Sequence, residues 1–286
     1  WNLMCYQGGY LEVRFQLSGQ PLWPALGVWP AIWTMGNLAR DTYPATAEGV
    51  WPFTYDECVC PGPESSYGQR QRISACKEQA RYGLNTYQGR GAPEIDLLET
   101  TLCLRQMTPP LKQILGALDN DTCLITSLQL TPRPPPEIRP MLNTLPSPSH
   151  PWYQSRAPIY YGNETCENSA WYGEWDYDTL GAITVLNGTS YTDFHTVGLY
   201  SHIGPSCLVH TWHGTTWPEG RPSLEQKATC RNESYLEWYH DGYLVTRVPG
   251  AAFGPYGNTP TREFPQEPMY VLLDLKLSPS RWGYPD

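Results

Sequence analysis

The clearest hydrophobic pattern lies near the N-terminus, where apolar and polar residues alternate over positions 10–17. Leu11, Val13, Phe15 and Leu17 are apolar, and the residues between them are polar. Successive side chains of a strand point to opposite faces of its sheet, so this alternation predicts a half-buried strand.

Short apolar segments of the same kind recur along the chain. Two of them, 235–240 and 243–248, flank Asp241-Gly242, a dipeptide typical of a two-residue β-hairpin turn. Further strands are expected at residues 29–33, 93–99, 124–130, 182–186, 194–200 and 269–277. The only helix expected is a short one around residues 111–118. The pattern therefore predicts one all-β sandwich domain over residues 1–286.

Four stretches lack a sustained period and are expected to be insertions or long loops. They cover residues 40–90, 104–122, 132–180 and 204–234. The first is rich in Gly, Pro, Cys and Ser, which indicates a loop pinned by disulfides. The third contains the proline-rich run 132–151, which we interpret as a loop because strand-like sequence resumes on both sides of it.

The composition favours short strands and is compatible with a sugar-binding groove. With 29 Pro and 25 Gly there is little room for long helices. There are 12 Trp and 20 Tyr, whereas charged residues make up only 16% of the chain. Flat aromatic rings cover the C–H face of a pyranose in sugar-binding grooves, but the same rings also pack cores. Composition alone leaves both roles open.

The charge distribution excludes one class of partner. The net charge is −9 and no basic cluster occurs, so a nucleic-acid partner is not expected. No run approaches the roughly 18 apolar residues of a membrane span. The nearest, residues 26–35, is interrupted by Pro30.

Cysteines and glycosylation motifs indicate the oxidising secretory pathway. The chain has nine cysteines and four Asn-x-Ser/Thr sequons, at Asn120, Asn163, Asn187 and Asn232. An odd count means that one thiol is unpaired or is bonded outside this sequence. We expect a location in the secretory lumen, at the cell surface or outside the cell.

No metal or cofactor is expected. Cys58, Cys60 and Cys76 have no recognised zinc-ligand spacing and no His nearby, so disulfides are favoured there. His210-x-x-His213 is the one further pair with metal-ligand spacing, and we do not assign it a metal.

The acidic segment Glu94-Ile95-Asp96-Leu97-Leu98-Glu99 carries the candidate chemistry. In a regular strand Glu94 and Asp96 share a face, whereas Glu99 falls on the opposite one. One extra residue at Leu97-Leu98, accommodated as a β-bulge, would bring Glu99 back beside them. A retaining glycosidase needs a nucleophilic carboxylate and a protonated carboxyl about 5–5.5 Å apart. The alternative is a solvated acidic strand face or a calcium-binding edge.

This segment resembles the bulged signature of glycoside hydrolase family 16, the laminarinase-type jelly rolls. Further segments resemble the fungal-type β-glucan synthesis-associated branch of that family. They are residues 29–38 (WPAIWTMGNL), 49–58 (GVWPFTYDEC), 89–93 (GRGAP), 235–242 (YLEWYHDG) and 267–277 (EPMYVLLDLKL). The resemblance covers most of the chain and is thin at 104–122, 132–180 and 204–234. It implies a concanavalin-like jelly roll.

The resemblance also implies roles for single residues. Glu94 would be the nucleophile, Asp96 the assisting carboxylate and Glu99 the acid/base; we call these residues the three acids. Trp29, Trp33 and Asn37 fall on positions that line the donor side of the family's groove. His195 falls on a strand that places a His near the acids, and a structural role is the alternative for it.

The resemblance favours an enzyme that builds or remodels β-glucan, cleaving or transferring it through a covalent intermediate. The alternatives are a secreted endo-β-1,3-glucanase and a non-catalytic β-glucan-binding scaffold. The expected partner is a β-glucan polysaccharide or oligosaccharide. The chain starts at Trp1 without an initiator Met or signal peptide, so we expect a fragment. The resemblance implies that this fragment lacks terminal strands of the family's catalytic domain. Membrane contact is expected only through an upstream anchor, as in a type II membrane protein.

Overall fold

The computed structural model describes residues 4–17, 28–39, 91–102, 122–130, 159–160, 165–169, 178–186, 188–208, 224–253 and 263–277. Its strands are β1 (Gly9–Phe15), β2 (Val28–Gly36), β3 (Glu94–Leu102), β4 (Thr122–Leu130), β5 (Ile159–Tyr160), β6 (Thr165–Ser169), β7 (Asp178–Val185), β8 (His195–His202), β9 (Tyr235–His240), β10 (Tyr243–Pro249) and β11 (Met269–Leu277).

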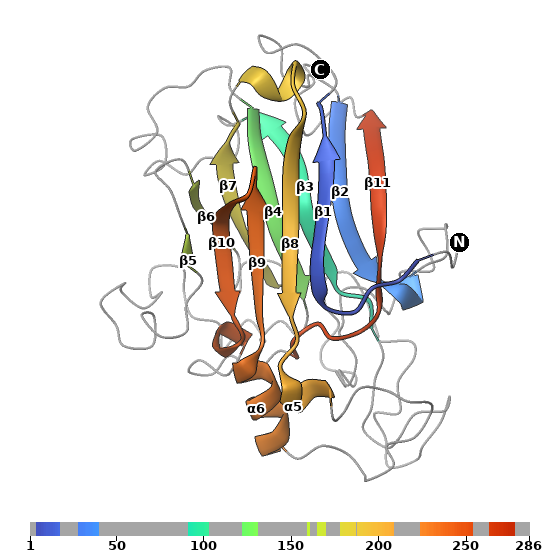
Figure 1. Cartoon of the computed structure of the whole chain (residues 1–286), viewed down its shortest axis with the longest axis vertical. Helices are drawn as coiled ribbons and strands as arrows, with labels where there is room; N and C mark the ends of the chain where they lie inside the picture. The colour runs from blue at the N-terminus through green and yellow to red at the C-terminus, as the bar shows by residue number, and fades with distance from the viewer. Residues whose placement is uncertain are drawn as a thin grey trace, which may run out of the picture.

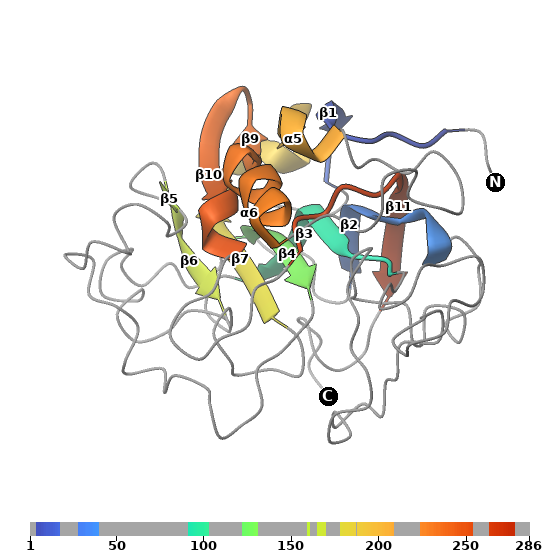
Figure 2. The same ribbon diagram turned by 90° about the horizontal axis from the view of Figure 1, so that it is seen from below.

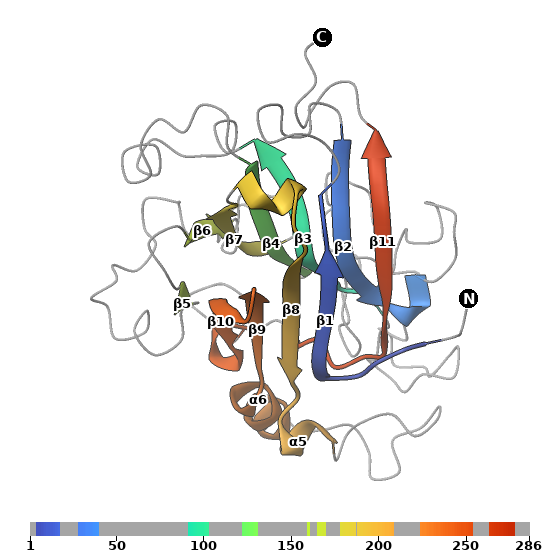
Figure 3. The same cartoon turned by 45° about the horizontal axis from the view of Figure 1, so that its top comes forward.

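These strands form two antiparallel sheets that lie face to face (Figures 1 and 2). The six-stranded sheet has the order β11-β2-β3-β4-β7-β6, and the five-stranded sheet has the order β1-β8-β9-β10-β5. β11 and β6 are the edges of the larger sheet (Figure 3). The predicted all-β fold with few helices is confirmed. Strands β5 and β6 lie in a stretch that was expected to be loop.

One hydrophobic core fills the space between the sheets. From the larger sheet it takes side chains of β2, β3 and β4, and from the smaller sheet side chains of β1, β8, β9 and β10. Its members with at most 2% of their surface exposed include Ile95, Leu97, Leu98, Leu124, Leu128, Leu199, Leu236, Trp238 and Val248. Burial on this scale is the main driving force that holds the two sheets together.

The predicted hairpin turn joins β9 to β10. Asp241 and Gly242 have φ values of 48° and 77°. Positive φ at both central residues is the requirement of a type I′ turn, which Asp-Gly satisfies because glycine carries no Cβ. The Asp241 amide donates to the Thr196 carbonyl at 2.9 Å, so the turn is tied to the start of β8.

Two helices occupy the predicted 204–234 insertion, at one end of the sandwich (Figure 1): α5 (Pro205–Leu208) and α6 (Leu224–Glu233). A disulfide between Cys207 and Cys230 joins them. The end of α6 lies against the backbone of Gly250, where a Cβ would come within 1.6 Å of the Arg231 carbonyl oxygen. The sequence of α6 has no apolar stripe, so it was missed; the disulfide and this close approach fix it instead.

Several expectations fall outside the described residues. They concern the helix around 111–118, the Cys58, Cys60 and Cys76 group, and the His210-x-x-His213 pair. Within the described ranges, none of the helices has the length and apolar character needed to span a membrane.

Candidate active site

A β-bulge interrupts β3 where the acidic segment required one. Between Asp96 and Glu99 the register of β3 on β4 shifts, so that Leu97 and Leu98 together oppose a single residue of β4. On the other side of β3, the register with β2 shifts at the same place. The predicted bulge is therefore confirmed from both neighbouring strands.

The bulge sorts the side chains of β3 by chemistry. Ile95, Leu97 and Leu98 are each at most 1% exposed and belong to the core between the sheets. Glu94, Asp96 and Glu99 consequently lie on the opposite, outer face of the six-stranded sheet. Without the extra residue, the strand period of two would turn Glu99 into the core.

Two polar side chains of β4 hold Glu94 and Asp96. The Gln129 amide donates to Glu94 Oε1 at 2.7 Å and to Asp96 Oδ2 at 3.1 Å, and the Ser127 hydroxyl donates to Asp96 Oδ2. From inside the sandwich, the Trp238 indole N–H donates to the Asp96 backbone carbonyl at 2.9 Å. Asp96 is thus fixed from both faces of the sheet.

The protonation of the acids follows from their burial. Burial raises the pKa of Asp96 to about 6, although hydrogen bonds with Ser127, Gln129 and Glu94 act in the opposite direction. Burial is also the main cause that raises the pKa of Glu99 well above its usual range, and the charge of Asp96 adds to it. Neighbouring carboxyls cannot both ionise easily. Burial and the neighbouring charge of Asp96 therefore both favour the protonated form of Glu99.

The aromatic residues of β2 lie next to the acids. Trp33 pairs with Asp96 in the sheet, and Trp29 lies two residues before the partner of Glu99, so both indoles share the acids' face. A hydrogen bond from Trp29 lowers the pKa of Glu99 and opposes part of the burial effect. Asn37 follows β2 in the 3₁₀ helix η1 (Asn37–Ala39), half-buried.

A fourth carboxylate on this face was not predicted. Asp274 of β11 accepts a hydrogen bond from the Trp33 indole at 2.7 Å, and its charge raises the pKa of both Asp96 and Glu99. Strand alternation in residues 269–277 puts Asp274 on the opposite face of β11 from Leu273. Only the pairing of β11 with β2 brings Asp274 to the acids. Ser127 was missed for the same reason.

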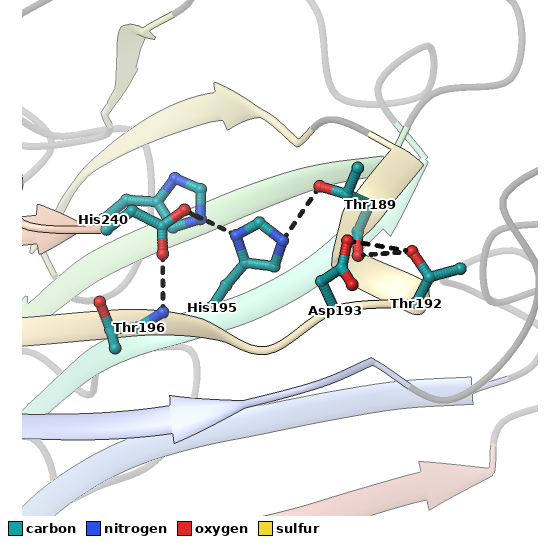
Figure 4. A network of polar contacts seen from close by, with 7 residues as sticks. Thr189, Thr192, Asp193, His195, Thr196 and His240 are labelled. Carbon is teal, nitrogen blue, oxygen red and sulfur yellow. Dashed lines mark hydrogen bonds and ion pairs between the residues drawn. The ribbon is translucent and has the colours of Figure 1, made fainter.

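His195 lies in a different part of the molecule. It begins β8 in the five-stranded sheet, and Figure 4 shows its contacts. Its Nδ1 lies 2.6 Å from Asp241 Oδ2 and its Nε2 lies 3.1 Å from Thr189 Oγ1. The structure therefore brings together Trp29, Trp33 and the three acids, but it joins His195 to a separate polar cluster.

That cluster is tightly held. Burial raises the pKa of Asp241, but hydrogen bonds from His195 and from the Thr196 amide outweigh it, so the pKa lies below its ordinary value. Burial lowers the pKa of His240, which stacks on His195 with ring centroids 5.8 Å apart. The cluster thus has an ionised carboxylate beside two imidazoles.

Over its whole length the chain is similar to curated proteins named for β-glucan synthesis. The chain is 29% identical to the beta-glucan synthesis-associated protein KRE6 of Candida albicans, covering 100% of this chain and 34% of that protein. It is 28% identical to SKN1 of the same organism and 27% identical to KRE6 of Saccharomyces cerevisiae, over 33% and 34% of their lengths. The chain thus spans about a third of the length of the curated relatives it matches.

A sequence model of one family covers residues 1–286 from end to end. The strand that carries the three acids and the strands that surround it all fall within this match. The chain belongs to the beta-glucan synthesis-associated protein SKN1/KRE6/Sbg1 family.

Proposed function

We propose that this chain is the catalytic domain of a retaining enzyme that cleaves or transfers β-linked glucan, built on the concanavalin-like jelly roll of glycoside hydrolase family 16. The bulge in β3 carries this proposal, because it places Glu99 on the same face as Glu94 and Asp96. The raised pKa of Glu99 supplies the second requirement, a carboxyl that enters the reaction protonated.

In the proposed reaction, the Glu94 carboxylate attacks the anomeric carbon and the glycosidic C–O bond breaks. Glu99 gives its proton to the departing oxygen, which leaves a glycosyl ester on Glu94. Glu99, now ionised, then takes a proton from an incoming hydroxyl whose oxygen attacks the anomeric carbon and releases Glu94. Asp96 keeps the pKa values of these two carboxyls different. The distance between the Glu94 and Glu99 carboxyls is expected near the retaining value of about 5–5.5 Å.

The acceptor decides between building and digesting glucan. A sugar hydroxyl gives transfer, and water gives hydrolysis. The relatives are named for β-glucan synthesis, which favours transfer in this chain. The proposal of transfer has two alternatives that experiments must separate from it: a secreted endo-β-1,3-glucanase and a non-catalytic β-glucan-binding scaffold.

We also propose that the protein works in the lumen of the secretory pathway or at the cell surface, held there by an anchor outside this chain. The Cys207–Cys230 disulfide and the exposed sequon residue Asn232 on α6 support an oxidising, glycosylating compartment. Digestion of the purified protein with an N-glycosidase should lower its mass.

The proposal can be tested by trapping the intermediate. The protein at its natural length is treated with an activated 2-deoxy-2-fluoro laminaribioside, and the labelled peptide is identified by mass spectrometry. We expect label on Glu94, none in Glu94→Gln, and normal labelling in Glu12→Gln, which changes an exposed glutamate of the other sheet.

Product analysis decides the direction. Wild-type protein is incubated with β-1,3 and β-1,6 gluco-oligosaccharides, and products longer than the substrate indicate transfer. Shorter products alone indicate the glucanase. Binding of glucan with neither products nor label would refute the enzyme and leave the scaffold.

A further inference from the structure

The cluster around His195 has the composition of a metal site and plays no part in the proposed glucan chemistry. His195, His240 and Asp241 each offer one ligand atom, and the three atoms lie within 4.8 Å of one another. The residues come from the start of β8, the end of β9 and the following hairpin turn. They belong to the five-stranded sheet, whereas the three acids belong to the six-stranded one.

Two of the three groups are already oriented as metal ligands are. His195 Nε2 lies 3.1 Å from Thr189 Oγ1, which can accept an Nε2–H once a metal takes the place of the proton that Nδ1 now donates to Asp241. Asp241 Oδ1 accepts from the Thr196 amide at 2.8 Å, which leaves Oδ2 facing the histidines. Metal ligands usually have such second partners, which set the tautomer and the ring orientation.

The third group, His240, lacks such a second partner within the described residues. His240 Nε2 is buried and makes no hydrogen bond in the described part of the chain. It lies 3.8 Å from Asp241 Oδ2, too far for a hydrogen bond. A buried nitrogen without a partner loses its hydrogen bonds to water on folding and gains none in return, which costs free energy. A hydrogen bond between His195 and Asp241 alone does not remove that cost.

We propose that His195 Nδ1, His240 Nε2 and Asp241 Oδ2 bind one Zn²⁺. Two imidazole nitrogens and one carboxylate oxygen are ligands that Zn²⁺ prefers, whereas Ca²⁺ takes six to eight oxygens. Ligand atoms about 2.0–2.1 Å from a tetrahedral zinc are about 3.3 Å from one another. The present separations of 2.6 Å and 3.8 Å bracket that value. The Asp241 side chain is 38% exposed, so water can take the fourth position.

Bound zinc would fasten the β9–β10 turn to β8. The Asp241 amide already bonds to the Thr196 carbonyl at 2.9 Å, and the metal would add a second link between the same two segments. The expected effect is therefore greater resistance to unfolding. No change in the glucan chemistry is expected.

The test is calorimetric titration of the protein at its natural length with ZnCl2, after treatment with a chelator. The test variants are His240→Gln and Asp241→Asn, because asparagine also tolerates the positive φ of the turn. The matched control is His202→Gln, another histidine of β8 outside the cluster. We expect one zinc per chain, weakened at least about tenfold in both test variants and unchanged in the control. CaCl2 should give no binding.

Two further measurements keep the result interpretable if a variant is destabilised. X-ray absorption at the zinc edge of the wild-type protein should show two imidazoles among the ligands. The melting temperature of the wild type should rise with ZnCl2 and fall back with EDTA. Absence of stoichiometric binding would overturn the proposal, and so would zinc binding that both test variants retain.

Discussion

Replacing Asp274 by asparagine tests whether this residue tunes the proposed acid. Asparagine has nearly the same shape and its Oδ1 can still accept from the Trp33 indole, so the substitution removes mainly the charge. Asp274 raises the pKa of Glu99, so we expect that pKa to fall in Asp274→Asn.

The size of the shift follows from the sheet register. Asp274 pairs with Ala31 and Ala31 pairs with Glu99, so the three residues form one row across β11, β2 and β3. Neighbouring strands are about 4.8 Å apart, so the backbones of Asp274 and Glu99 are about 9.6 Å apart across the sheet. At an effective dielectric constant of about 20 their repulsion is about 1.7 kcal/mol, or about 1.3 pKa units. Because Asp274 is exposed, salt at physiological ionic strength would screen this repulsion and reduce the shift to about 0.4 pKa units.

The assay is a carboxyl ¹³C NMR titration of protein labelled at glutamate, with Glu99 assigned by its loss in Glu99→Gln. This reading needs no enzymatic activity. Asp193→Asn, which changes an exposed acid beside the other sheet, is the control and should leave Glu99 unmoved. A pKa of Glu99 that stays within about 0.1 unit of its wild-type value (about 0.14 kcal/mol), or that rises, in Asp274→Asn would refute the reasoning. If glucan turnover is detected, the alkaline limb of its pH profile should move to lower pH in the same variant.

Three further predictions concern stability. Replacing both Cys207 and Cys230 by alanine should lower the free energy of unfolding by about 3.4 kcal/mol, the loop-closure value for their separation of 23 residues, measured by urea denaturation. An unchanged urea midpoint would contradict it. Gly36→Ala should cost about 1–3 kcal/mol, since its Cβ would lie 2.7 Å from a backbone carbon. Retention of the wild-type melting temperature would count against that close approach. Burial raises the pKa of Asp96 to about 6, so the folded state holds its proton more tightly and stability falls as pH rises from about 4 to about 6, by about 3 kcal/mol. Thermal melting over that range should show a smaller loss in Asp96→Asn than in the wild type, because Glu99 still contributes in the variant; equal pH dependence would refute it.

Local patterns in the sequence were enough for most strands and for the hairpin turn. Strand alternation and the Asp241-Gly242 dipeptide depend on neighbours along the chain, and the structure confirms both. The bulge could also be anticipated, because the period of two leaves Glu99 on the wrong face without it. The helix α6 could not, since its polar sequence is held by a disulfide and by packing on Gly250.

The surroundings of the acids depended on which strands pair, and in what register. Ser127 and Gln129 reach Asp96 because β4 lies beside β3, and Asp274 reaches the same face because β11 pairs with β2. Nothing within any one of these segments indicates the partner strand.

By itself, then, the sequence determined the type of the elements, the three acids and their need for a bulge, since each follows from geometry within a few residues. The tertiary structure alone decided that Asp274 joins the acids and that His195 lies with His240 and Asp241 on the other sheet. Strand order and register join residues far apart in the chain, and they are selected by burial of the common core between the two sheets.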